Sequence, residues 1–344
     1  MGMHNEIRQQ PDVFSEILRD NATPISEVVS RLRDVSFGHV VIAARGTSDN
    51  AARYAKYLWG AHNRLQVALA APSLFTSYQS PPNLKDALVV GISQSGESPD
   101  LVEVLAEGRR QGRPTLAITN RPGSPLAANA DYIVDIKAGE EYAVAATKTY
   151  TAQLLAVAML SDTMRMGAIS DDLRRAPDLM ADVLRTEPLV GDIARDFADL
   201  RSCAILGRGF NHSTAFEWAL KLQEVTYALA HPYSTADFRH GPIAVVEPGF
   251  SIMAAAPDGP LFGDMLALLE DLSNERHART LTISNRDEAL EASRYGIALP
   301  RTTPEWLSPM PIIVAAQLFT YHLGKIKGFD TDHPRGLSKV TKTT

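Results

Sequence analysis

Short apolar runs alternate with helical patterns along this chain, and the alternation occurs twice. In the first series we expect strands at 40–43, 87–92, 114–119 and 132–136, and helices at 49–59, 99–111 and 145–164. In the second we expect strands at 204–206, 251–256 and 280–284, and helices at 213–228, 261–277 and 310–327. Apolar strands followed by helices are typical of a parallel sheet covered on both faces. We therefore predict an α/β fold with two tandem, doubly wound parallel-sheet domains.

The two series match at the residue level. Arg45-Gly46-Thr47-Ser48 and Arg208-Gly209-Phe210-Asn211 each lie between an expected strand and an expected helix, which indicates a gene duplication. The expected organisation is a helical segment at 1–27, a first domain at 28–165, a helical linker at 166–195, a second domain at 196–330 and a tail at 331–344. Pro177 and Pro188 are expected to break the helical linker.

The segment Gly91–Asp100, GISQSGESPD, carries the clearest chemical signal. An apolar strand ends there, a polar loop follows with Ser93, Gln94, Ser95 and Ser98, and Pro99 suits the first position of a helix. Hydroxyls and backbone N–H groups beside a helix N-terminus can hold a phosphate dianion. The loop lacks the lysine of nucleotide-binding loops, which favours a single phosphate on a small metabolite. The alternative is a serine-rich turn that only caps the helix.

Composition narrows the classes of protein to consider. The 344 residues have a net charge of −6 and no run of basic residues, which argues against a nucleic-acid partner. No apolar stretch is long enough to cross a membrane, and the N-terminus lacks a signal-peptide core. Cys203 is the single cysteine and is expected to be a small buried hydrophobic residue, which excludes an internal disulfide. Together, these features predict a cytoplasmic protein.

Metal and cofactor sites are not indicated by the sequence. It contains no H-E-x-x-H motif and no pair of cysteines. Asp330, Asp332 and His333 lie close together along the chain, but they read as part of a solvated loop. We therefore expect neither a metal nor a cofactor.

Seven motifs, which include the two already described, follow one another along the chain in an order that identifies a family. They are Glu6-Ile7-Arg8-Gln9-Gln10-Pro11, Arg45-Gly46-Thr47-Ser48, Ser93-Gln94-Ser95-Gly96-Glu97-Ser98, Val144-Ala145-Ala146-Thr147-Lys148, Ala219-Leu220-Lys221-Leu222-Gln223-Glu224, Arg239-His240-Gly241-Pro242 and Pro334-Arg335-Gly336-Leu337-Ser338-Lys339. With these motifs the chain resembles tandem sugar isomerase (SIS) domain proteins over nearly its whole length. The resemblance is to the isomerase half of glucosamine-6-phosphate synthase, and it implies two flavodoxin-like SIS domains.

Two departures from the synthase affect the expected reaction. The glutaminase domain and its N-terminal cysteine nucleophile are not found in this sequence, and Arg45 stands where the synthase has cysteine. Chains of this reduced kind resemble SIS-type glucosamine-6-phosphate deaminases, which release ammonia.

The resemblance also assigns roles to individual residues. It implies phosphate and sugar contacts from Thr47, Ser48, Ser93, Gln94, Ser95, Ser98, Val144 and Ala145. It makes Glu224 the base that moves a proton between C1 and C2. Lys221, three residues earlier on the same helix face, is expected to steer Glu224 or to neutralise a developing enediolate. A surface ion pair between these two residues is the alternative.

Two further residues take roles from the resemblance. His240 assists ring opening and comes from the neighbouring subunit of a homodimer. Lys339 contacts the open-chain sugar and can form a Schiff base, although a lysine on a polar tail usually has no role.

The expected function is an enzyme that converts glucosamine 6-phosphate to fructose 6-phosphate and ammonia. One alternative is a related enzyme that uses free ammonia in the synthetic direction or acts on another phosphosugar. The other is a non-catalytic regulator that binds a phosphosugar. A regulator needs only the phosphate-binding loop, so the presence of Glu224, His240 and Lys339 favours an enzyme.

Overall fold

The computed structural model describes residues 2–339, which divide into two compact units. The first-sheet unit contains residues 12–141, 148–174 and 338–339, and the second-sheet unit contains residues 2–11, 142–147 and 175–337. Each unit holds one five-stranded sheet in which every strand pairing is parallel. The predicted α/β class, with two parallel sheets, is confirmed.

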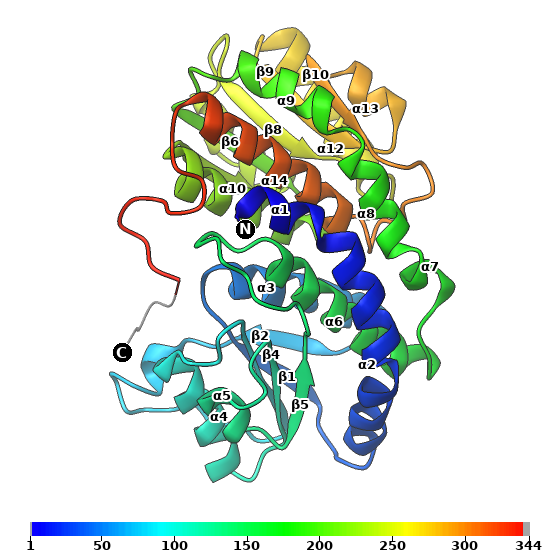
Figure 1. Cartoon of the computed structure of the whole chain (residues 1–344), viewed down its shortest axis with the longest axis vertical. Coiled ribbons are helices and arrows are strands. Elements are labelled where there is room, and N and C mark those ends of the chain that lie inside the picture. Colours follow the sequence, from blue (N-terminus) through cyan, green and yellow to red (C-terminus); the bar gives the residue numbers. More distant parts are fainter. Residues whose placement is uncertain (1, 340–344) are drawn as a thin grey trace. The chain divides into compact units, whose positions relative to one another are not determined.

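The first sheet has the order β2-β1-β3-β4-β5. Its strands are β1 (His39–Ala43), β2 (Gln66–Leu69), β3 (Ala87–Ser93), β4 (Thr115–Thr119) and β5 (Tyr132–Asp135). The helices that connect or follow them are α3 (Gly46–Asn63), η1 (Pro72–Leu74), α4 (Pro99–Arg110), α5 (Pro125–Ala128) and α6 (Lys148–Met166). Figure 1 shows α3 and α6 on one side of this sheet and α4 and α5 on the other.

The second sheet has the order β10-β9-β8-β6-β7. Its strands are β6 (Ser202–Gly207), β7 (Leu229–Tyr233), β8 (Ser251–Ala255), β9 (Arg279–Ser284) and β10 (Tyr295–Ala298). Its helices are η2 (Gly209–Asn211), α10 (His212–Thr226), α11 (Thr235–Arg239), η3 (Pro242–Val245), α12 (Phe262–Glu270), η4 (Asp271–Glu275), α13 (Asp287–Glu291) and α14 (Pro309–Ile326). Counted within each sheet, both follow the order 2-1-3-4-5 of flavodoxin-like folds. The shared order agrees with a duplication.

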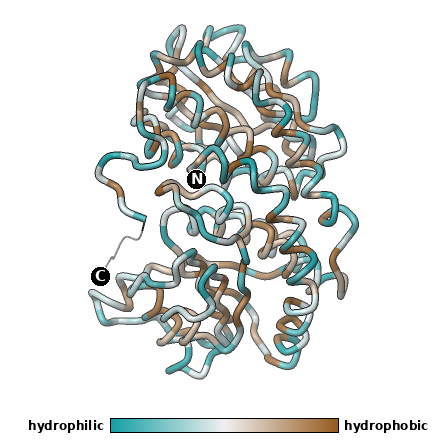
Figure 2. The backbone as a smooth tube through the Cα atoms, in the orientation of Figure 1, coloured by the Kyte–Doolittle hydropathy of each residue, from teal (hydrophilic) through white to brown (hydrophobic). Residues whose placement is uncertain are grey.

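Alternate residues of each strand face opposite helical layers, as strand geometry requires. In the first sheet, Ala87 and Val89 pack against Leu101 and Leu105 of α4. In the second sheet, Ile252 and Ala254 pack in the same way in a cluster that includes helix α12. The strands in Figure 2 are coloured mainly as hydrophobic, which fits sheets covered on both faces.

The remaining helices are α1 (Met3–Arg8), α2 (Gln10–Arg33), α7 (Asp171–Arg174), α8 (Ala176–Leu184) and α9 (Glu187–Asp196). Pro177 and Pro188 break the helical linker, as the sequence predicts, because the segment is divided into α7, α8 and α9 just before each proline. Each lies in the first turn of a helix, α8 or α9, where a missing N–H costs nothing. These prolines therefore mark where helices begin.

Three expectations need correction. Helix α6 begins at Lys148 and not at Ala145, so Val144 and Ala145 lie in the preceding loop. The helix expected over 261–277 ends as an α-helix at Glu270 and continues as a π-helical turn to Glu275. Strands β2, β7 and β10 were not predicted from the sequence.

Cys203 is buried in β6, as expected, and burial raises the pKa of its thiol to about 12. Over the described residues, no helix has both the length and the continuous apolar character that crossing a membrane requires.

Candidate functional site: a hydroxyl loop and a charged helix

The hydroxyl loop, residues 93–98, connects the end of β3 to the start of α4. It lies where the strand order reverses between β1 and β3, which is the usual ligand position in such sheets. The Oγ of Ser93 accepts a hydrogen bond from Gly96 N at 3.1 Å, and the Oγ of Ser95 accepts one from Glu97 N at 3.3 Å. Because each hydroxyl oxygen accepts a backbone N–H, its own hydrogen can be donated to another acceptor. This arrangement suits a bound phosphate oxygen.

The turn of this loop depends on Gly96, which has a φ of +65°. A Cβ at this position would lie 2.1 Å from the Oγ of Ser124, so any side chain would force the two segments apart. The neighbouring segment fixes the loop further, because Asn120 N donates to Gln94 O at 3.2 Å and Leu126 N donates to Gly96 O at 3.0 Å. These backbone hydrogen bonds therefore hold the loop in place.

The capping alternative does not account for Ser98. This residue is the N-cap of α4, but its side chain makes no capping hydrogen bond in the described structure. Its carbonyl oxygen accepts from Leu101 N and Val102 N, both at 3.1 Å. The half-buried Ser98 hydroxyl is thus not used to begin the helix.

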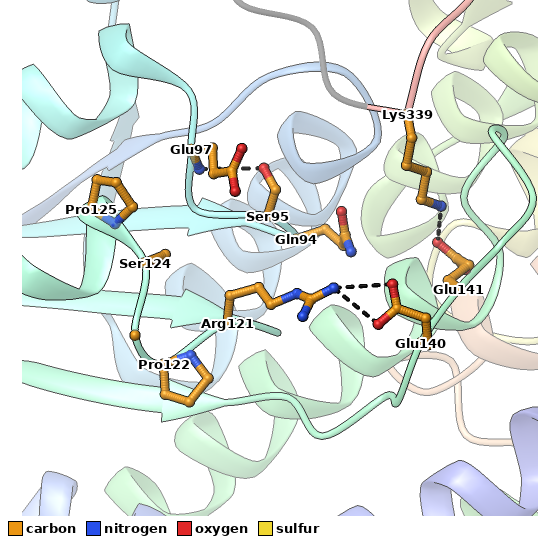
Figure 3. Close-up of a pocket in the computed structure, with 11 residues that line it drawn as sticks. Gln94, Ser95, Glu97, Arg121, Pro122, Ser124, Pro125, Glu140, Glu141 and Lys339 are labelled. Atoms are coloured by element: carbon orange, nitrogen blue, oxygen red, sulfur yellow. Dashed lines mark hydrogen bonds and ion pairs between the residues drawn. The ribbon is translucent and has the colours of Figure 1, made fainter.

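A cavity of about 580 Å³ opens beside the hydroxyl loop within the first-sheet unit. Its lining residues are Gln94, Ser95, Glu97, Arg121, Pro122, Gly123, Ser124, Pro125, Glu140, Glu141 and Lys339. Figure 3 shows Arg121 directed at Glu140 and Lys339 directed at Glu141. The cavity thus brings two of the predicted phosphate-binding side chains, Gln94 and Ser95, together with the tail lysine. Its volume is within the usual range for small-molecule sites.

Thr47 and Ser48 lie in the first turn of α3, after β1, which is the strand adjacent to β3. Ser48 is buried, and its Oγ accepts a hydrogen bond from Gln153 Nε2 at 3.0 Å. Arg45, directly before α3, forms an ion pair of 2.8 Å with Asp100, whose side chain is only 2% exposed. This ion pair joins the loop after β1 to the first turn of α4.

Helix α10 of the second-sheet unit carries a charged triad, two of whose members are buried. The Nζ of Lys221 lies 2.5 Å from Oε2 of Glu224 and 3.4 Å from Oε1 of Glu217. The Lys221 side chain is 1% exposed and that of Glu217 is 0% exposed, whereas Glu224 is 21% exposed. The surface ion pair considered above therefore does not describe Lys221 and Glu224. Glu224 is the member of the triad that solvent or a substrate can reach.

The sequence analysis did not identify Glu217 as a member of this triad. Its spacing of four residues before Lys221 places both side chains on one helix face, and this spacing was the available signal.

Val144 and Ala145 lie in the segment 142–147, which belongs to the second-sheet unit. Buried Glu6 of α1 accepts hydrogen bonds from Tyr142 N and from Ala143 N, the latter at 3.2 Å. Val144 N donates to Asp332 O at 3.0 Å. The carboxylate of Asp332 also accepts from Met3 N at 2.7 Å, so Asp332 is a structural anchor, although the sequence suggested a solvated loop.

His240 follows α11 and is exposed. Its helix is anchored by buried Phe238, and Ser234 Oγ caps the helix by accepting from Asp237 N at 3.0 Å. Within residues 2–339 the imidazole of His240 forms no hydrogen bond. The His240 side chain is therefore exposed at the end of an anchored helix.

A larger hollow, of about 950 Å³, lies in the second-sheet unit among α8, α9 and α14. Two of its four cationic side chains are paired with the two carboxylates of its lining, because Glu187 pairs with Arg8 at 2.6 Å and Asp192 pairs with Arg195. No group of three or more potential metal-binding side chains occurs among the described residues. The hydroxyl loop and the α10 triad remain the two groups with the chemistry of a site.

Comparison with known proteins identifies the family of this chain. The SIS domain model matches residues 35–161 and 196–323. The glutamine–fructose-6-phosphate aminotransferase [isomerizing] of Gloeobacter violaceus is 34% identical over 98% of this chain. This chain spans 58% of that relative's length.

Solved structures agree with the sequence comparison. The C-terminal domain of glucosamine-fructose-6-phosphate aminotransferase from Francisella tularensis is 28% identical and superposes with a TM-score of 0.85, covering 96% of this chain and 98% of that one. A glucosamine-6-phosphate deaminase from Thermotoga maritima shares the fold, with a TM-score of 0.77 at 21% identity and 99% coverage of both chains. With a matching domain on each of its two parallel sheets, the chain belongs to the SIS domain family.

Proposed function

We propose that this chain is a phosphosugar aldose–ketose isomerase that converts glucosamine 6-phosphate to fructose 6-phosphate and ammonia. The observation that carries the proposal is the cavity in which the hydroxyl loop and Lys339 meet. The loop supplies neutral donors for a phosphate dianion, and the lysine supplies a cation or an amine beside it. The names of the relatives support a phosphosugar as the substrate class.

In the proposed reaction, Glu224 removes the proton from C2 of the open-chain amino sugar. The same carboxyl group returns that proton to C1, while the C2 amine loses one proton and the C1 oxygen gains one, which leaves an imine at C2 and an alcohol at C1. Water then hydrolyses the imine, giving the C2 ketone and ammonia. Buried Lys221 holds the Glu224 carboxylate from one side, which fixes its position. His240 exchanges the proton needed to open the ring.

Ammonia release is proposed because of the chemistry available in these 344 residues. Their single cysteine, Cys203, is buried in β6, and its raised pKa keeps the thiol protonated. These residues by themselves therefore lack a thiolate that could take ammonia from glutamine. In an assay of these residues alone, free ammonia is then the product or the substrate.

The test is a steady-state assay of the purified chain in both directions. We expect glucosamine 6-phosphate to yield ammonia and fructose 6-phosphate in equal amounts, with synthesis requiring high ammonium. The second candidate is synthesis of glucosamine 6-phosphate, which the relatives' names favour. Efficient synthesis at low ammonium would support that candidate. Phosphosugar binding without turnover would instead indicate a regulator.

We further propose a homodimer in which His240 enters the site of the neighbouring subunit. In support, His240 is exposed at the end of the anchored helix α11, and the adjacent turn Pro242–Val245 contains apolar Val245, which is 58% exposed. Mixing inactive His240→Ala with inactive Glu224→Gln chains should restore part of the activity, since some mixed dimers hold one intact site. No recovery after verified subunit exchange would place both residues in one chain's site.

A further inference from the structure

Two consecutive carboxylates of the cavity, Glu140 and Glu141, have different surroundings. Glu140 is 54% exposed and makes a two-pronged ion pair with Arg121, at 2.9 and 3.0 Å. The Glu141 side chain is 0% exposed, and its Oε2 lies 2.8 Å from the Nζ of Lys339 (Figure 3). The same buried carboxylate accepts from Thr149 N at 3.2 Å and from Thr149 Oγ1 at 2.7 Å.

This difference in burial decides what each ion pair contributes. An exposed pair such as Arg121–Glu140 is worth about 0–1 kcal/mol because water solvates both charges. A buried carboxylate has lost its water and needs hydrogen bonds and an opposite charge in compensation. At Glu141, Thr149 supplies the first two hydrogen bonds, and Lys339 supplies a full positive charge.

The four residues before Lys339 have little burial of their own. Residues 335–338 are all exposed, whereas Lys339 is half-buried at the cavity. Contact with Glu141 therefore brings the end of this exposed segment into the cavity, beside Gln94 and Ser95.

We propose that Glu141 is a positioning residue that docks Lys339 in the phosphosugar cavity. The proposal rests on the proposed function, because it treats Lys339 as part of the substrate site. Glu141 acts through Lys339 and need not touch the substrate. Without this carboxylate, Lys339 is released to solvent and the cavity loses its amine beside the hydroxyl loop.

The first experiment measures the position of Lys339 without any substrate. Acetic anhydride acetylates exposed amines, and peptide mass spectrometry gives the rate at Lys339. We expect at least threefold faster acetylation in Glu141→Gln than in the parent chain. Glu140→Gln, which removes the adjacent carboxylate of the same cavity, should leave the rate at Lys339 unchanged. Equal rates in Glu141→Gln and the parent chain would overturn the proposal.

If Glu141→Gln does not fold, as judged by circular dichroism and thermal melting, Glu141→Asp replaces it. This variant keeps the charge but withdraws the carboxylate by one methylene group. It should accelerate acetylation of Lys339 by a smaller factor than Glu141→Gln. No acceleration in Glu141→Asp would count against docking by Glu141.

The second experiment is a double-mutant cycle on turnover of glucosamine 6-phosphate. We expect Glu141→Gln and Lys339→Met each to lower kcat at least tenfold, and the double variant to be no worse than Lys339→Met alone. Losses that multiply in the double variant would mean that Glu141 acts independently of Lys339. If the parent chain turns over no phosphosugar, the proposed function fails, and the acetylation rates still decide the role of Glu141.

Discussion

The two sheets of this chain share a scaffold and differ in what they carry. Both have the same strand order, and both join the loop after their first strand to the first turn of a later helix by an arginine–aspartate pair. In the first-sheet unit the pair is Arg45–Asp100, at 2.8 Å, and in the second-sheet unit it is Arg208–Asp264, at 2.6 Å. The ion pair has therefore persisted through the duplication as a structural element.

The chemical groups have not persisted in the same way. Where the first-sheet unit has the hydroxyl loop, the second has Pro257-Asp258-Gly259-Pro260 after β8. Counted from the shared arginines, Glu217 and Lys221 of α10 correspond to Tyr54 and Leu58 of α3, both buried. One copy thus carries groups suited to phosphate binding, and the other carries groups suited to proton transfer. The comparison predicts that variants in the two copies affect different steps.

The largest effect is expected from the hydroxyl loop. Replacing both Ser95 and Ser98 by Ala should weaken binding of fructose 6-phosphate by several kcal/mol, at about 1.5–3 kcal/mol per hydrogen bond to a charged group. Isothermal titration calorimetry measures the affinity, and Ser80→Ala, at an exposed serine of the same unit, is the control. Unchanged affinity in the double variant would remove phosphate binding from this loop.

In the other copy, Glu224→Gln should leave binding of fructose 6-phosphate intact and lower kcat by about 10²–10⁴-fold, the usual contribution of a general base. Glu103→Gln, which alters a carboxylate of α4 paired with Arg110, is the control and should retain activity. A Glu224→Gln variant with near-normal kcat would reduce Glu224 to an ion-pair partner of Lys221.

The charged triad should also affect stability. Lys221→Met removes the ammonium that faces the buried Glu217 carboxylate, and it should lower the free energy of unfolding by about 3–5 kcal/mol. Leu58→Met at the corresponding position of α3 is the matched control and should cost less than about 1.5 kcal/mol. Urea denaturation followed by circular dichroism gives both values. Similar costs for the two variants would show that the charged copy has no special dependence on its lysine.

The smallest expected effect is on the free energy of unfolding at acidic pH. Hydrogen bonds from Thr235 and Arg208, together with the charge of Arg239, lower the pKa of Asp264 from its ordinary 3.8. A lowered folded-state pKa adds stability above the unfolded pKa, and this stability is lost as pH falls through the folded value. Asp264→Asn should thus cost about 0.3–1 kcal/mol at pH 6–7 and progressively less below pH 3.8. A cost that grows as pH falls would contradict this sign.

The sequence predicted the buried central strands because each is a continuous apolar run. It did not predict β2 and β7, which lie at sheet edges with exposed residues along them. Pro232 lies within β7, where an edge strand tolerates a missing donor. Edge strands are specified by their pairing partner more than by their own composition.

Candidate site residues could be proposed from the sequence where they are close together along the chain. The hydroxyl loop and the Lys221–Glu224 spacing could be read directly, and family resemblance added His240 and Lys339. Glu141 could not be found in this way, because its contact with Lys339 joins residues 198 positions apart. Only the folded chain shows that this carboxylate is buried and that the tail lysine meets it.

A structure of the chain with bound fructose 6-phosphate tests the central claim most directly. The account predicts the phosphate group against residues 93–98, within hydrogen-bond distance of the Ser95 hydroxyl and the loop N–H groups. A phosphate bound instead in the hollow lined by Arg185, Arg195 and Lys325, or beside Arg208 and Arg239 of the second copy, would contradict it.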